Sequence, residues 1–122
     1  MSNWEVHAIR YADQTDRTRG RAFLMDDNHD APYPIDFYIW LLRRGDEIIL
    51  VDTGFDEAEA QDRGFALRQN IGAALAPFGL QPGDITQLIV THLHFDHAGG
   101  LYLFPNATLY LQAAEMAYAT GP

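Results

Sequence analysis

The 122-residue chain contains no cysteine and no lysine, and its single serine is Ser2. Without cysteine there is no disulfide, no thiolate nucleophile and no cysteine-ligated zinc site. Without lysine there is no Schiff-base chemistry and no Walker-type phosphate loop. A lone serine next to the amino terminus argues against a serine-hydrolase triad. Hydrolytic chemistry in this chain would therefore depend on carboxylates, histidines or a metal ion.

Positive charge is also scarce. Eight arginines stand against 17 acidic residues, which gives a net charge of −9, and the acids are spread along the chain. We therefore expect no basic face for a phosphate backbone and no nucleic-acid partner. The amino terminus lacks the basic flank and apolar run of a signal peptide, and no segment approaches the ~18 apolar residues of a membrane span. These features predict a cytoplasmic protein without a membrane partner.

Apolar residues make up 48% of the chain, which is typical of one folded domain. Alternating or continuous apolar runs predict strands at residues 4–11, 21–25, 35–42, 47–51, 87–91 and 107–111. Residues 35–51 should form a hairpin, while residues 26–34 form a loop and residues 56–62 a loop or weak helix. The predicted fold class is α+β, with a largely antiparallel sheet and helices on one face.

Two helices are expected. Between residues 70 and 78 the apolar side chains recur at helical spacing, and Gly79 stands where a helix commonly ends. A second helix should begin within residues 113–119.

Three of the five histidines and one aspartate lie within residues 92–97 (HLHFDH), directly after the predicted strand 87–91. Nitrogen and carboxylate ligands at this density suit Zn²⁺, Mn²⁺ or Fe²⁺ better than an ion that prefers oxygen alone. Together with ligands from elsewhere, these four side chains would be too many for a single tetrahedral zinc ion. The segment therefore indicates two metal ions.

The geometry of the segment depends on how far the strand continues. In an extended chain, alternate side chains share a face, so His92, His94 and, if extension persists, Asp96 project together. His97 breaks this alternation and requires the chain to turn. The glycine pair 99–100 should make that turn sterically easy.

The HxHxDH pattern resembles the signature of the metallo-β-lactamase superfamily, and the string 92–100 (HLHFDHAGG) is especially similar to its acyl-homoserine lactonase branch. Similar segments occur at residues 50–54 (LVDTG), 82–86 (PGDIT) and 112–115 (QAAE). The resemblance starts at about residue 35. It implies a metallo-β-lactamase-type αββα sandwich, of which residues 1–122 would be the amino-terminal half, a single incomplete domain.

The resemblance also implies the roles of individual residues. His92 and His94 would hold one divalent ion, and Asp96 and His97 a second, with Zn²⁺ the first choice and Mn²⁺ or Fe²⁺ as alternatives. Asp52 would orient the ligands from behind. An alternative for Asp52 is a strand-end carboxylate that accepts hydrogen bonds from a turn.

The implied reaction is hydrolysis of a small-molecule lactone or ester by a metal-bound hydroxide, with Asp96 as the catalytic group that passes a proton to the leaving oxygen. A thioesterase of the glyoxalase II type and a β-lactamase are alternatives within the superfamily. A non-catalytic half-domain is the alternative outside it. No basic residue stands near the motif in the sequence, so a phosphodiester substrate has no support.

The family's remaining metal ligands belong to a second half that these residues do not contain. His7 and His29 are expected to be ordinary core or surface residues. Two ligands for each ion would bind weakly, since about three are usual. We therefore expect a fragment, a chain that pairs with a missing carboxy-terminal half, or a homo-oligomer, and an exposed apolar sheet face.

Six aromatic residues could line an apolar acyl pocket, but aromatic residues in strands are more often part of the core. We expect the core position for each of Tyr33, Phe37, Tyr38, Trp40, Tyr102 and Phe104.

Overall fold

The computed structural model describes residues 3–25 and 27–121. Ser2, and Asp26 of the predicted loop 26–34, lie outside the described residues. The strands are β1 (Glu5–Gln14), β2 (Ile35–Arg44), β3 (Glu47–Val51), β4 (Ala66–Leu67), β5 (Gln87–Val90) and β6 (Thr108–Leu111). The helices are α1 (Arg19–Ala22), α2 (Glu57–Arg63), α3 (Ile71–Leu75), α4 (Phe95–Ala98) and α5 (Ala113–Thr120), and short 3₁₀ turns lie at Ala76–Phe78, Pro82–Asp84 and Leu101–Leu103.

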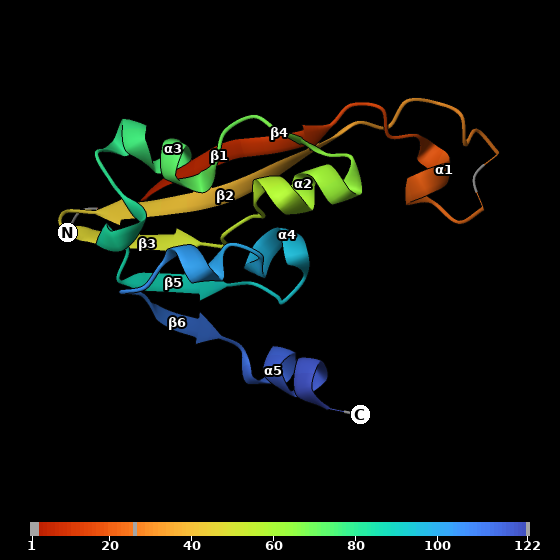
Figure 1. The fold of residues 1–122 in the computed structure, drawn as a ribbon. Helices are drawn as coiled ribbons and strands as arrows, with labels where there is room; N and C mark the ends of the chain where they lie inside the picture. Colours follow the sequence, from red (N-terminus) through yellow and green to blue (C-terminus); the bar gives the residue numbers. More distant parts are fainter. Residues whose placement is uncertain (1–2, 26, 122) are drawn as a thin grey trace.

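The described strands form one mixed sheet in the order β4-β1-β2-β3-β5-β6 (Figure 1). The pairs β1–β2 and β2–β3 are antiparallel, in line with the predicted hairpin and largely antiparallel sheet, and β1–β4 is antiparallel too, but β3–β5 and β5–β6 are parallel. The sheet is therefore less antiparallel than the sequence indicated. The connection from β3 to β5 contains α2 and α3, and a crossover of this length can return the chain to the same end of the sheet.

The predicted strand at residues 21–25 is wrong. Residues Arg19–Ala22 form the helical turn α1, and β1 instead extends to Gln14. β1 pairs with β2 along most of its length and with β4 at Ala12 and Asp13, and residues 21–25 pair with none of these strands. Leu24 and Met25 are 99% and 95% exposed, which shows that this segment has no apolar face to bury. The two-residue strand β4 was not predicted.

The predicted helix at residues 70–78 is confirmed as α3 followed by a 3₁₀ turn. The Asn70 side chain accepts a hydrogen bond from the Ala73 backbone N–H at 2.8 Å, which caps the first turn. Ile71 and Leu75 are buried on its inner face. Gly79 ends the segment with a left-handed φ of +74°. The acidic segment that follows β3 is a true helix, α2, capped by the Asp56 side chain.

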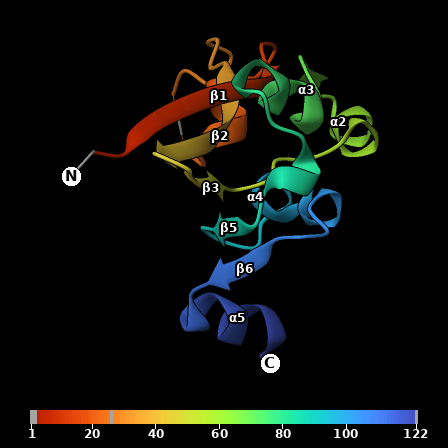
Figure 2. The ribbon, with the colours of Figure 1, turned by 90° about the vertical axis from the view of Figure 1, so that its left-hand side faces the viewer.

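The core lies between the sheet and the helices on one of its faces, which include α2 and α3 (Figure 2). Every second residue of β2, β3 and β5 points into it, and the fully buried examples are Ile39, Leu41, Leu50 and Leu88. Among the described residues, no helix is long and apolar enough to span a membrane.

The opposite face of the sheet is uncovered in the described part of the chain. A cavity of about 720 Å³ is open on this face, with Ile49, Ile89 and Tyr110 among its lining residues. Tyr110 is 52% exposed, and Val6 on the far strand is 63% exposed. The apolar face expected from the sequence is thus present.

Candidate metal centre

The parallel pairing of β3 and β5 brings two distant loops together. Val51 of β3 is level with Ile89 of β5, and the next backbone N–H, that of Asp52, donates to the Ile89 carbonyl at 2.8 Å. Parallel strands end at the same edge of a sheet. The segment Asp52–Gly54 therefore lies beside the histidine-rich segment that begins at residue 92.

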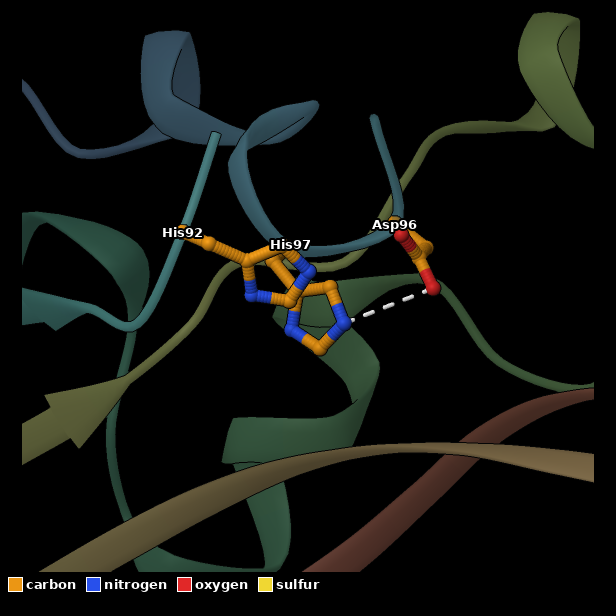
Figure 3. A group of neighbouring side chains, drawn as sticks. All are labelled: His92, Asp96 and His97. Carbon is orange, nitrogen blue, oxygen red and sulfur yellow. Dashed lines mark ion pairs between the residues drawn. The ribbon is translucent and has the colours of Figure 1, made fainter. Parts of the chain in front are cut away.

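Three of the four side chains proposed from the sequence as metal ligands converge. One ligand atom each of His92, Asp96 and His97 lies within 4.8 Å of the other two (Figure 3). The His97 Nε2 atom is 3.4 Å from Asp96 Oδ2, and the ring centroids of His92 and His97 are 4.0 Å apart. Two imidazole nitrogens and a carboxylate, all half-buried, form a donor set that suits a zinc-like divalent ion.

His94 lies beside this group but outside it. Its ring centroid is 4.6 Å from that of His92, and its side chain is exposed. The chain is extended up to His94 and becomes helical at Phe95, because the His94 carbonyl accepts the N–H groups of His97 and Ala98. The condition under which Asp96 would share a face with His92 and His94, that the chain stays extended, is therefore not met. Helix α4, and not an extended strand, presents Asp96 and His97.

The glycine pair has a different role from the one predicted. Gly99 and Gly100 follow the helical turn with φ angles of −64° and −99°, values that any residue can adopt. A Cβ at Gly99 would lie 2.4 Å from the Phe95 carbonyl oxygen, and one at Gly100 would lie 2.5 Å from the Thr53 carbonyl oxygen. The pair therefore allows close packing of the loop that contains Thr53, and not an unusual turn.

Asp52 is buried behind the ligand group. Its Oδ2 atom is 2.6 Å from His97 Nδ1, and its Oδ1 atom accepts the Thr91 backbone N–H at 2.8 Å. This one carboxylate thus makes both kinds of contact considered from the sequence, one with a histidine and one with a backbone N–H after a strand. Asp52 has a φ of +65°, a left-handed value that is strained for a residue other than glycine.

Asp52 contacts both imidazoles, one directly and one through Thr91. An ionised carboxylate only accepts hydrogen bonds, so its contact with His97 suits a proton on Nδ1, while Nε2 of the same ring faces Asp96. The Thr91 hydroxyl donates to Asp52, at 2.9 Å from Oδ2, and its oxygen lies 3.0 Å from His92 Nδ1.

Two further residues, Thr53 and Glu115, hold the segment in place. Thr53 donates from its backbone N–H and its hydroxyl to the His97 carbonyl, at 2.8 and 2.9 Å. Glu115 of α5 accepts the Leu93 N–H at 2.8 Å. Thr53 and Glu115 belong to the LVDTG and QAAE segments noted in the sequence, but the contacts themselves could not be read from it.

Tyr11 had no sequence signal at all. Its hydroxyl donates to the Asp96 backbone carbonyl at 3.0 Å across 85 residues of sequence, and its side chain is fully buried. Burial raises the pKa of Tyr11 far above the ordinary 10.0, and the charges of Asp96 and Asp52 raise it further. Tyr11 therefore remains a neutral hydrogen-bond donor at physiological pH.

Two cavities meet at Asp96. One of about 280 Å³ is lined by Tyr38, Trp40 and His97, and one of about 470 Å³ extends toward α1 and α2. The expected core position is confirmed for Phe104, which is 5% exposed. It is wrong for Tyr38 and Tyr102, which are 36% and 66% exposed. Tyr102 lies at the surface, where its hydroxyl donates to Asp56 at 2.9 Å.

Residues 38–120 match the family model of the metallo-β-lactamase superfamily. The chain belongs to this superfamily. An N-acyl homoserine lactonase of Azorhizobium caulinodans, AttM, is 30% identical over 111 residues, which cover 80% of this chain and 42% of that protein. An N-acyl homoserine lactonase of Bacillus cereus is 35% identical over 92 residues, covering 64% and 37% of the two chains. A probable metallo-hydrolase of Mycobacterium tuberculosis is 30% identical over 90 residues, covering 64% and 29%.

Solved structures agree with the metallo-β-lactamase fold. The crystal structure of a quorum-quenching N-acyl homoserine lactone lactonase superposes with a TM-score of 0.75 at 25% identity, over 100% of this chain and 51% of that one. AidC, a dizinc quorum-quenching lactonase, superposes with a TM-score of 0.73 at 19% identity, over 100% and 46%. The expected α+β fold class is confirmed. The chain spans about half the length of these structures and less than half of the curated relatives.

Proposed function

We propose that this chain carries the metal-binding, amino-terminal half of a lactonase-like metallohydrolase that opens a small lactone or ester. The observation that carries the proposal is the convergence of His92, Asp96 and His97 on one point. The lactonase relatives support the substrate class, and their larger size supports a second half beyond the matched region.

We assign His92 and His94 to one divalent ion and Asp96 and His97 to a second, with Zn²⁺ favoured over Mn²⁺ or Fe²⁺. AidC, described as a dizinc enzyme, supports two ions. His94 stands next to His92, and its exposed side chain has room to rotate toward an ion. The assignment leaves coordination positions for ligands from a further segment or from a second copy of the chain.

When bound, divalent ions would make water nucleophilic at neutral pH and stabilise negative charge on a carbonyl oxygen. The chain's own residues prepare this chemistry. Asp52 orients His97 directly and His92 through Thr91. The Asp96 carboxylate, which borders both cavities, is placed to pass a proton to the leaving oxygen of the opened ester.

The experiment uses the 122-residue chain and, in parallel, a longer chain that contains it together with a carboxy-terminal half from a homologous lactonase. Metal content is measured by elemental analysis, and turnover is measured on a lactone, a thioester and a β-lactam. We expect bound zinc, faster hydrolysis of the lactone than of the other two compounds, and loss of activity with a chelator. The His29→Ala variant, which alters a histidine outside the site, should keep both the bound zinc and the turnover.

Two results would contradict the proposal. Turnover that resists the chelator would contradict the metal mechanism, because that mechanism needs a bound divalent ion to activate water. Zinc binding without hydrolysis of any of the three substrates, in both chains, favours a non-catalytic metal-binding half-domain.

A further inference from the structure

Three of the eight arginines line one cavity next to the candidate metal centre. The 470 Å³ cavity is bordered by Arg17, Arg21 and Arg63, and Asp96 lies in the same wall. The sequence shows no basic residue near the HxHxDH motif, because these arginines lie about 30 to 80 residues before Asp96. The tertiary structure therefore creates a basic environment that the sequence pattern did not indicate.

Two of these arginines are not neutralised by neighbours. Within residues 3–25 and 27–121, the guanidinium groups of Arg17 and Arg21 form no ion pair. By contrast, four other arginines are paired with carboxylates, namely Arg10 with Asp36, Arg44 with Glu47, Arg63 with Glu59 and Arg68 with Asp13. In a chain with a net charge of −9, these two guanidinium groups place positive charge at one cavity, where it can attract an anion.

Arg63 is held in a defined position at the edge of the same cavity. Its Nε atom is 3.2 Å from Glu59 Oε1, one helical turn away, and its guanidinium carbon is 3.5 Å from the centroid of the Phe95 ring. The ion pair uses Nε, so the two terminal nitrogens remain available as donors. A guanidinium placed in this way recognises a carboxylate well, because its planar donors match the two oxygens.

Besides the arginines, Gln14 and Asp96, the cavity has an apolar and largely aromatic part of its wall. Phe37 and Phe65 have ring centroids 5.0 Å apart, and the rings of Phe65 and Phe95 are stacked at 6.0 Å with an interplanar angle of 17°. The cavity therefore combines an aromatic wall with arginine donors. This combination fits an apolar or aryl group that ends in a carboxylate, and it does not favour an uncharged alkyl tail.

We propose that this arginine pocket, formed by Arg17, Arg21 and Arg63, binds a carboxylate on the part of the substrate that does not react, so that the enzyme prefers lactones or esters with an anionic acyl or aryl group. The substrate preference rests on the proposed hydrolase function, whereas the anion binding does not. Asp96 connects the pocket to the candidate metal centre, so a substrate whose carbonyl lies at Asp96 can extend its anionic end toward the arginines.

The first test measures binding without catalysis. The metal-free, ¹⁵N-labelled 122-residue chain is titrated with phenylacetate and with its neutral analogue phenylacetamide, and NMR shifts are followed. We expect phenylacetate to bind more tightly than phenylacetamide and to perturb the Arg63 Nε–H signal. Its binding should weaken when salt is added. In the Arg17→Gln/Arg21→Gln double variant its affinity should fall about tenfold.

The control is Arg43→Gln, which removes one arginine charge next to the β2–β3 turn, at the opposite end of β2 from the pocket. Its affinity for phenylacetate should equal that of the wild type. Equal binding of the acid and the amide, or equal affinity in the double variant and the wild type, would overturn the proposal. The backbone amide spectrum checks that each variant is folded.

The second test uses the metal-loaded protein in the longest form that shows turnover. The value of kcat/KM should be higher for mono-p-nitrophenyl glutarate than for the neutral p-nitrophenyl pentanoate. In the double variant this preference should fall, because KM for the glutarate rises. Equal KM changes for both esters would overturn the pocket assignment and leave the metal-centre proposal intact. Arginine-dependent phenylacetate binding in a protein with no hydrolytic activity would support the pocket and contradict the proposed reaction.

Discussion

The Nδ1 atom of His97 lies 2.6 Å from a carboxylate oxygen of Asp52, although the two residues are 45 positions apart. This contact links the end of β3 to the helical turn α4. The same carboxylate bonds to Thr91, which contacts His92. Asp52 therefore contacts one half-buried histidine of the candidate metal centre directly and is linked to the other through Thr91.

Asp52→Asn should weaken metal binding, although the asparagine side chain fills the same space as the aspartate. An asparagine tolerates the left-handed backbone, but its amide can present a donor where His97 and Thr91 need an acceptor. We expect zinc affinity to fall by about 10- to 100-fold, measured by competition with a chelating dye. Asp46→Asn, at the exposed β2–β3 turn, is the charge-matched control. Unchanged affinity in Asp52→Asn would refute the orienting role.

Replacing His94 or His97 by alanine should abolish metal retention with little effect on the fold, because His94 precedes and His97 belongs to the short helix α4, and both side chains lie outside the core. Elemental analysis after gel filtration gives the metal content, and circular dichroism reports the fold. His97→Ala should also lower the stability of the Asp52 loop, because Asp52 stays buried without one of its partners. Metal content equal to that of the wild type in both variants would remove these residues from the ligand set.

Tyr11→Phe should destabilise the protein by about 1 kcal/mol at neutral pH, through loss of the hydrogen bond to the Asp96 carbonyl. The pKa of Tyr11 is raised by folding above its ordinary 10.0, so the native state holds this proton more tightly than the unfolded chain. Stability from this group is thus complete below pH 10 and declines as the pH rises above it. Urea unfolding between pH 7 and 11 should show a smaller alkaline decline for Tyr11→Phe, and parallel curves would contradict the assignment.

The uncovered sheet face should cause self-association of the 122-residue chain. Tyr110 and Val6 expose apolar surface on this face, while Ile49 and Ile89 border its cavity. Light scattering should show a mass above that of the monomer, and Tyr110→Glu should shift it toward the monomer. Leu24→Glu, which adds a charge at an almost fully exposed site outside the sheet, should not. A wild-type monomer at high micromolar concentration would disprove this expectation.

Local patterns in the sequence determined the elements that depend on neighbouring residues. The β2–β3 hairpin, the capped helix α3 with Gly79 at its end, and the crowding of His92, Asp96 and His97 all follow from residues close together in the chain. The same reasoning could not show that residues 21–25 form no strand. Their apolar content does not indicate whether another strand lies beside them to pair with.

The tertiary structure alone decided how these elements meet. The parallel register of β3 and β5 brings Asp52 to His97, and the packing of β1 brings Tyr11 to the Asp96 carbonyl. The grouping of Arg17, Arg21 and Arg63 around one cavity has the same origin. Side-chain periodicity records which face of an element is apolar, but hydrogen bonds and charge clusters between distant segments depend on which strands pair and in which direction. In this chain the crossover through α2 and α3 determines that pairing.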